Sequence, residues 1–251
     1  MKTITAHLTD VTSAATVEEL WAIHTAYMSD FGFDRLIYGY TRYNTAVSLG
    51  DPQDWVLLTN HGDAYMDAFL TDGLMFQAPM VHWALENSGA CSWRWLDEMR
   101  QTDALTESEQ KVLAFNKSMN VVAGYTISFK SVSERTKAAI ALTAKPGLDQ
   151  DGIDKIWARH GDEIIVANNV MHLKLLSLPY TGQRHLTKRQ REVLQWVGDG
   201  KTTQDIALLL DLTPATIEKH LRLAREALDV ETTAQAVMKA AFSNQMFVVD
   251  I

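Results

Sequence analysis

Hydrophobic residues recur at three- and four-residue spacing in several segments of the first 180 residues, which is the pattern of an amphipathic helix. This spacing predicts helices over 16–31, 62–70, 79–86, 106–119 and 153–178. Threonines at the start of the first and fourth segments, Thr16 and Thr106, are suited to cap them, and a proline opens the third. The first part of the chain is therefore rich in helices whose apolar faces need a partner layer.

Aromatic and β-branched runs lie between these helices and predict strands over 36–43, 55–59, 121–130 and 138–143. The last predicted helix could break at His160–Gly161. Helix, strands, helices, strands and helix in this order indicate a central sheet flanked by helices. We therefore expect an α+β protein whose first domain, residues 1–178, is an α/β/α sandwich.

A turn-rich stretch over 179–184 predicts a linker to a second domain, residues 185–251. Four short helices are predicted there, each after a threonine that can cap it. Their expected ranges are 187–197, 203–210, 214–228 and 233–242. Three residues, Asp211–Thr213, separate the second from the third, which forces the sharp turn of a helix-turn-helix unit. The second domain is thus predicted to be all-α.

Overall composition is that of a folded protein: 251 residues, 47% hydrophobic and 22% charged. Apolar runs fall far short of the ~20 residues that a membrane span needs, and the N-terminus lacks a signal-peptide pattern. We therefore expect a cytoplasmic protein with no membrane partner. Its single cysteine, Cys91, cannot form an internal disulfide.

Charge is distributed unevenly between the two predicted domains. Residues 181–251 hold 9 of the 23 Lys+Arg and 9 of the 31 Asp+Glu, so residues 1–180 carry 14 − 22 = −8. Seven basic residues nevertheless cluster between Lys188 and Arg225. Such a cluster indicates either a polyanion partner or ordinary solvated helix faces, because acidic residues are interspersed.

The third helix of the second domain separates apolar from polar positions. Ile217, Leu221, Ala224 and Leu228 form one stripe, and the basic residues form another that is free to enter a major groove. The start of the second helix suits a DNA phosphate. Candidate DNA-binding residues are Lys201, Thr202, Thr203, Thr216, Glu218, Lys219, Arg222 and Arg225. The alternative is a small helical docking domain.

Several short motifs of this region resemble the DNA-binding domain of LuxR-type transcription factors. The similarity runs through residues 186–242 and rests on Leu186–Leu194, Gly200–Thr202, Asp205–Ala207, Lys219–Leu221 and Ala227–Val230. It implies that Glu218, Lys219 and Arg222 face bases and that the fourth helix helps to pair two copies on a two-fold symmetric site. The family usually has a glutamate where Gln190 stands, so a carboxylate is lost here.

In the quorum-sensing branch of this family, the N-terminal domain is an α/β/α sandwich that binds N-acyl homoserine lactones. The other branch has a receiver domain, but no acidic pair follows an early apolar strand in this sequence. The resemblance to the lactone-binding domain is anchored at Pro79, Trp93 and Gly124. It places the three aromatic residues that hold the lactone in this family at His61, Tyr65 and Phe69, and the aspartate that binds its amide at Ala78.

Phe69 and Ala78 lack the hydroxyl and the carboxylate that the resemblance calls for. A buried amide without its partner costs about 1–3 kcal/mol, so the usual lactone pose would lose one to two orders of magnitude in affinity. Aromatic and soft residues could still enclose an apolar or aryl ligand, or simply form the core. Those candidates are Tyr38, Tyr40, Tyr65, Phe69, Met75, Phe76, Met80 and Trp93, and Ala78 is a further candidate beside them. The polar residues that could orient a ligand are His61, Tyr65, and Thr143 or Ser128.

Enzymatic interpretations have little support in the sequence. Gly200-Lys201-Thr202 lacks the glycine that a phosphate-binding loop needs at Gln195, and hydrolase and zinc-protease motifs do not occur. A lone cysteine such as Cys91 is usually a small packed hydrophobe. We therefore predict no enzyme, no metal and no cofactor.

Three hypotheses follow. The first is a dimeric regulator that binds a small apolar signal, double-stranded DNA and RNA polymerase. The second is an orphan regulator of the same type that folds and binds DNA without a ligand. The third is a small-molecule enzyme fused to a DNA-binding module, which turnover of a ligand would reveal.

Overall fold

The computed structural model describes residues 2–45, 47–131, 133–180 and 184–246. Within these, the chain divides into two compact units. The first comprises Met1–Asp51 and Trp55–Leu175, and the second Pro52–Asp54 and Leu176–Ile251. Each unit has its own core of buried hydrophobic side chains.

The first unit is built on a five-stranded sheet in which all neighbouring strands are antiparallel. The strands lie in the order β2-β1-β5-β4-β3. Their bounds are Phe33–Thr41 (β1), Val56–Thr59 (β2), Gly89–Ser92 (β3), Gly124–Ser128 (β4) and Lys137–Ala144 (β5). The sequence predicts four of these strands but not β3, because four small residues, Gly-Ala-Cys-Ser, carry no β-branched or aromatic signal.

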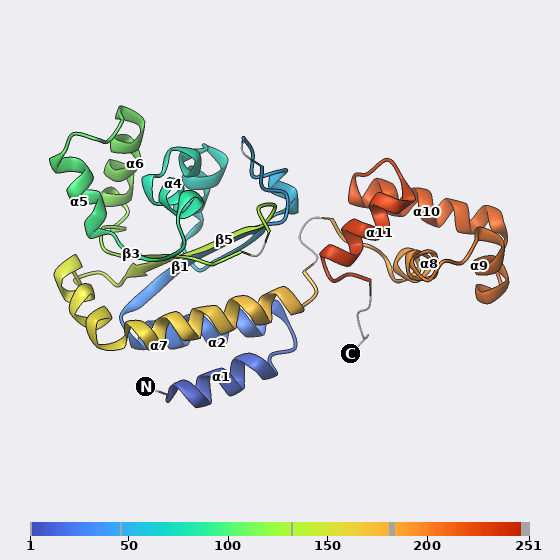
Figure 1. Cartoon of the computed structure of the whole chain (residues 1–251), viewed down its shortest axis with the longest axis horizontal. Helices are drawn as coiled ribbons and strands as arrows, with labels where there is room; N and C mark the ends of the chain where they lie inside the picture. Colours follow the sequence, from blue (N-terminus) through green and yellow to red (C-terminus); the bar gives the residue numbers. More distant parts are fainter. Residues whose placement is uncertain (1, 46, 132, 181–183, 247–251) are drawn as a thin grey trace. The chain divides into compact units, whose positions relative to one another are not determined.

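One face of the sheet is covered by three helices, α1, α2 and α7 (Figure 1). They span Ile4–Ser13, Val17–Asp30 and Gln150–Ser177. Helix α7 is continuous, so the break that His160–Gly161 suggested does not occur. Gly161 serves packing instead, because a Cβ there would lie 2.8 Å from the indole nitrogen of Trp157. Helix α1 was not predicted, since its buried positions are His7 and Val11 and threonines interrupt its stripe.

Shorter helices cover the opposite face of the sheet (Figure 1). They are α3 (Asp63–Met66), the π-helical turn η2 (Asp67–Thr71), the 3₁₀ turn η3 (Leu74–Gln77), α4 (Pro79–Glu86), α5 (Arg94–Gln101) and α6 (Glu107–Ser118). A further 3₁₀ turn, η1, spans Pro52–Asp54. The two helical layers around one sheet confirm the predicted α/β/α sandwich, although α5 was not expected from the sequence.

The second unit contains the four predicted helices: α8 (Lys188–Gly198), α9 (Thr203–Leu210), α10 (Pro214–Leu228) and α11 (Thr233–Phe242). The side chain of the threonine before each helix accepts a backbone N–H of the first turn, as predicted. Gln190 completes a capping box at α8, its Oε1 accepting the Thr187 N–H at 2.8 Å. An amide therefore caps α8 at the position where the family usually has a carboxylate.

Two histidines are fully buried among α1, α2 and α7 of the first unit. The ring of His7 stacks on that of Tyr27 at 3.8 Å, and Nε2 of His24 lies 3.0 Å from Oδ1 of Asn168. Burial lowers the pKa of His7 to about 4 and that of His24 to about 3, because an imidazolium there would lose its hydration. Both rings are therefore neutral at physiological pH.

These pKa values predict acid sensitivity of the first unit. His7 takes up a proton near pH 6.5 in the unfolded chain but only near pH 4 in the folded chain. The free energy of unfolding therefore falls as pH decreases through this window. Each histidine contributes a slope of up to about 1.4 kcal/mol per pH unit. His7→Phe keeps a ring on Tyr27 and should flatten the slope, as measured by urea unfolding at several pH values. The same substitution at the exposed His185 is the control, and equal slopes for wild type and His7→Phe would refute this assignment.

Candidate functional site

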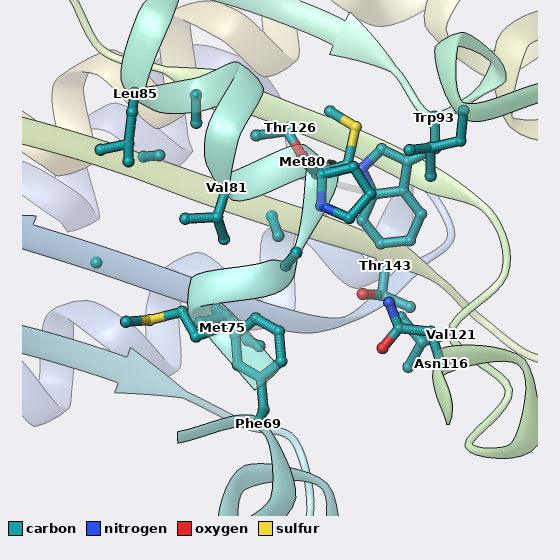
Figure 2. Close-up of a pocket in the computed structure, with 18 of the residues that line it drawn as sticks. Phe69, Met75, Met80, Val81, Leu85, Trp93, Asn116, Val121, Thr126 and Thr143 are labelled. Atoms are coloured by element: carbon teal, nitrogen blue, oxygen red, sulfur yellow. Dashed lines mark hydrogen bonds between the residues drawn. The ribbon is translucent and has the colours of Figure 1, made fainter. Parts of the chain in front are cut away.

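A cavity of about 540 Å³ lies in the first unit between the sheet and the layer of short helices (Figure 2). This volume is within the range of small-molecule sites. Most of its lining is apolar and comes from β1, β5, η2, η3, α4 and the Trp93 turn. The cavity is thus a candidate site for an apolar ligand.

Small side chains on β1 and β5 create the floor of this cavity. Alternate residues of a strand face opposite sides, so Gly39, Ala139 and Ala141 point toward the short helices. Gly39 pairs with Ala139, and Ile37 with Ala141. A Cβ at Gly39 would meet no atom within 4 Å, which shows open space above this position. Larger residues here would fill the space as ordinary core.

The structure brings most of the predicted ligand residues to the cavity. Its lining includes Tyr40, Tyr65, Phe69, Met75, Ala78, Met80, Trp93 and Thr143. Tyr38, His61 and Ser128 are not part of the lining. Phe76 is half exposed and packs edge-on against Trp55.

The sequence analysis predicted Tyr38 as a ligand-binding residue, but the alternation of side chains along β1 turns it away from the cavity. It lies on the sheet face that α7 covers, and its hydroxyl is 2.7 Å from Nδ1 of His172. Tyr40 has the same parity, and its ring centroid lies 6.1 Å from that of His172. Tyr40 therefore borders the cavity without pointing its ring into it.

Ser128 and His61 have structural partners instead of the cavity. The Ser128 hydroxyl is buried within hydrogen-bonding distance of two carbonyls at the end of α4, those of Ala84 and Asn87. The ring of His61 lies 4.6 Å from that of Tyr65, and its Nε2 is 3.4 Å from the Thr143 hydroxyl. His61 thus lies behind Tyr65 and supports it.

Among the polar residues of the cavity that the sequence analysis missed, two bind its aromatic side chains. Asn116 on α6 accepts the Tyr65 hydroxyl proton at 3.0 Å, and the Thr126 hydroxyl on β4 accepts the Trp93 indole N–H at 2.9 Å. Burial raises the pKa of Tyr65 far above its ordinary value, so this hydroxyl stays a donor. Asn116 follows Val112 and Leu113 on one helix face, and a polar residue within such an apolar stripe is a usable signal.

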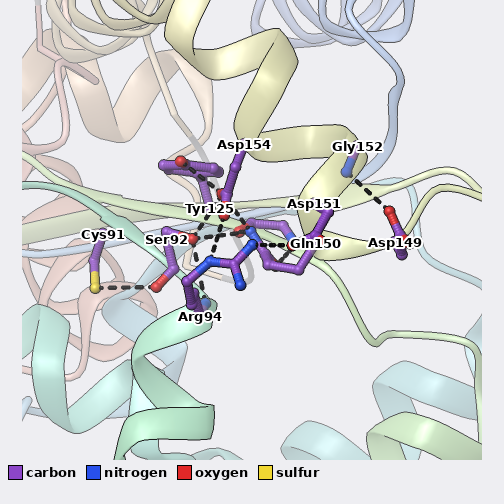
Figure 3. Close-up of polar contacts among 10 residues, drawn as sticks. Cys91, Ser92, Arg94, Tyr125, Asp149, Gln150, Asp151, Gly152 and Asp154 are labelled. Atoms are coloured by element: carbon purple, nitrogen blue, oxygen red, sulfur yellow. Dashed lines mark hydrogen bonds and ion pairs between the residues drawn. The ribbon is translucent and has the colours of Figure 1, made fainter.

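Trp93 is held over the cavity by a close backbone approach. A Cβ at Gly124 would lie 2.2 Å from the Leu142 carbonyl oxygen and 3.1 Å from the Trp93 ring, so only glycine fits. Gln150, at the start of α7, accepts the Gly124 N–H and donates to Asp154 and to the Ser92 hydroxyl (Figure 3). This polar network joins the wall of the cavity to α7.

Asp154 is the centre of that network. Its carboxylate accepts hydrogen bonds from Ser92, Arg94, Tyr125 and Gln150 (Figure 3). These donors hold the pKa of Asp154 below its ordinary value, against the opposing effect of burial. The carboxylate is therefore charged and fully engaged in structure.

The nearby Cys91 thiol is partly buried, and its Sγ lies 3.4 Å from the Ser92 carbonyl oxygen. Burial raises the pKa of Cys91 to about 11, which keeps the thiol protonated. Among the residues that the structure describes, no cluster of three His, Cys, Asp or Glu side chains could hold a metal ion.

The second unit presents the predicted DNA-binding helix α10 with its apolar stripe buried and its polar stripe exposed. Ile217, Leu221, Ala224 and Leu228 lie in the core, as predicted. Lys219 and Lys201 are exposed, and the exposed Arg222 forms an ion pair with Glu226 at 2.6 Å. Exposed pairs of this kind contribute little to stability, so Arg222 can exchange its partner readily.

The other predicted DNA-binding residues have structural partners. The Thr203 hydroxyl donates to Glu218 at 2.8 Å, and Arg225 donates to the Thr233 hydroxyl of α11 at 3.0 Å. Thr202 caps α9, and the Thr216 hydroxyl lies 2.9 Å from that of Thr213, the cap of α10. Arg225 is half buried, so in this arrangement it joins two helices and does not project from the surface.

An α/β/α sandwich with an internal apolar cavity, joined to a four-helix unit with a helix-turn-helix, defines a regulator with a sensory and a DNA-binding domain. The family model for the autoinducer binding domain matches residues 16–175, and that for bacterial regulatory proteins of the luxR family matches 184–240. The chain therefore belongs to the luxR family of bacterial transcription regulators. This family consists of regulators and not of enzymes.

Related proteins agree with this assignment. The transcriptional activator protein ExpR of Dickeya dadantii (strain 3937) is 23% identical over 197 residues, covering 74% of this chain and 76% of ExpR. The quorum sensing-dependent transcriptional regulator RpaR of Rhodopseudomonas palustris is 31% identical over 132 residues, 52% of this chain and 51% of RpaR. A crystal structure of the N-acylhomoserine lactone dependent factor CepR2 from Burkholderia cenocepacia superposes with a TM-score of 0.52 at 13% identity, covering 68% of this chain and 95% of CepR2. The last comparison shows the fold alone.

None of the helices in the described part of the chain combines the length and the apolar character needed to span a membrane.

Proposed function

We propose that the cavity of the first unit binds a small, largely apolar signal and that this controls DNA binding by a dimer on a two-fold symmetric operator. The observation that carries the proposal is the apolar cavity over Gly39, Ala139 and Ala141, which the fold leaves unfilled. Signals of the acyl or aryl homoserine lactone type, or non-lactone relatives, fit its character. Tyr65, Trp93 and Thr143 would orient the polar part of such a signal.

An alternative function is that of an orphan regulator that binds DNA without a ligand. Phe69 and Ala78 favour it, because they line the cavity where the family places a hydroxyl and a carboxylate. The polar groups that remain are already paired, Tyr65 with Asn116 and Trp93 with Thr126. A ligand amide in the family's usual pose would therefore lack its acceptor.

Thermal unfolding with a panel of acyl, oxo-acyl and aryl homoserine lactones tests ligand binding. A ligand present at 100 times its Kd adds about 2.7 kcal/mol to the free energy of unfolding, which raises the Tm. Ala141→Leu projects a larger side chain into the cavity and should abolish this rise. Ala22→Leu, on the exposed face of α2, is the control. An unchanged rise in Ala141→Leu would place the ligand elsewhere, and no rise in wild type together with tight DNA binding would support the orphan alternative.

The recognition surface of α10 is tested by Arg222→Ala. Loss of a base contact typically costs about 1–3 kcal/mol, so affinity for the cognate operator should fall about ten- to hundredfold. Arg189→Ala is a matched control, because Arg189 is also an exposed arginine in an ion pair with a glutamate, Glu192, but lies on α8. Operator affinities are measured by fluorescence anisotropy at fixed salt. Equal losses in the two variants would argue against a specific role of Arg222.

Dimerisation is proposed to use the outer face of α11. Exposed apolar residues follow one stripe of this helix: Ala234, Met238, Ala241 and Phe242. Met238→Asp places a charge in that stripe and should shift sedimentation equilibrium from dimer to monomer. Leu208→Asp is the control, since Leu208 is also an exposed apolar residue but lies on α9. A dimer that persists in Met238→Asp would exclude this face as the interface.

A further inference from the structure

The lining of the cavity follows strand β5, whose cavity-facing residues are Thr143, Ala141, Ala139 and Lys137. The six steps along the strand from Lys137 to Thr143 span about 20 Å. In Figure 2, Thr143 lies beside Asn116 and Val121, and Leu85 of α4 lies far to the other side. The cavity therefore has two ends: one at Thr143 and Trp93, and one at Lys137 and the last turn of α4.

At the Thr143 end, the neutral polar groups are paired with one another. Tyr65 binds Asn116, Trp93 binds Thr126, and the Thr143 hydroxyl lies 3.4 Å from the His61 ring. Phe69 and Ala78 add apolar surface to this end. A hydrocarbon chain can lie here without leaving a buried polar group unsatisfied.

At the other end, Lys137 is half buried and borders the cavity. Its Nζ donates to the Asn87 carbonyl at the end of α4 at 2.9 Å, which uses one of its three donors. Within the described residues, its ammonium forms no ion pair with a carboxylate. Burial lowers the pKa of Lys137, in agreement with a cation that lacks a nearby negative charge.

We infer that the cavity takes a chain-like carboxylate, with the carboxylate at Lys137 and the hydrocarbon chain over Ala139 and Ala141 toward Trp93. This inference rests on the proposed ligand-binding function of the cavity and specifies its ligand class. The polar group of the ligand then lies at the opposite end from Tyr65 and Ala78. A neutral lactone offers Lys137 no negative charge, whereas a medium-chain fatty acid does.

Binding of decanoate and of decanol, measured by calorimetry on the full chain near neutral pH, tests the inference. Both probes have the same hydrocarbon length, but only decanoate is charged. Wild type should bind decanoate at least about tenfold more tightly than decanol, because a charge-assisted hydrogen bond is roughly twice as strong as a neutral one. Lys137→Met should lose this preference while binding decanol as wild type does, which also shows that the cavity is intact. Lys137→Gln keeps a donor for Asn87 and should behave in the same way.

Two further lysines make the test specific. Lys111→Met removes a charge from the exposed face of α6, outside the cavity, and should leave the preference for decanoate unchanged. Lys117 borders the cavity but is exposed, so loss of the preference in Lys117→Met instead of Lys137→Met would overturn the inference.

Other outcomes separate this inference from the proposed function. Binding of homoserine lactones without any preference for decanoate would overturn the role of Lys137 and leave the cavity as a ligand site. If decanoate, decanol and the lactones all fail to bind, both the inference and the ligand-binding function are wrong.

Discussion

Strand alternation in β1 and β5 is the constraint on which the first unit depends. Both strands are covered on both faces, and they separate their residues by size. Leu36, Tyr38, Ile140 and Leu142 are fully buried large residues on the side of α7. On the other side, Gly39, Ala139 and Ala141 lie beside Ile37 and Thr143, and their small size leaves the cavity open. The same two strands therefore supply the packed core and the cavity.

Gly124 and Gln150 connect this cavity to the rest of the domain. The bare backbone at Gly124 admits the Trp93 ring, and Gln150 binds both main-chain groups of Gly124. Gln150 is the first residue of α7, so the part of the cavity wall that contains Trp93 and Gly124 is hydrogen-bonded to the first turn of that helix. Asp154, one turn later, accepts hydrogen bonds from four residues of the same region, so one polar network holds both the wall and the start of the helix.

The second unit separates stability from recognition along α10. Its buried stripe and its threonine caps give the helix its position, while Lys219 and Arg222 remain exposed. Glu218 and Arg225 link α10 to α9 and α11 by hydrogen bonds to threonine hydroxyls. The polar residues of α10 thus differ in role. Glu218 and Arg225 lie close to neighbouring helices and bind them, whereas Lys219 and Arg222 do not.

The sequence by itself determined the helices of the second unit, four of the five strands and the layered arrangement, since periodicity, caps and turns are local signals. Eight of the predicted ligand residues, including Tyr65, Trp93 and Thr143, also line the cavity, although most of its lining was not predicted. Tertiary structure alone decided that Tyr38 faces α7, that His61 and Ser128 have structural partners, and that Thr126 and Lys137 reach the cavity. These features depend on the face and register of strands and on contacts between distant segments. Neither is encoded in the spacing of residues along one element.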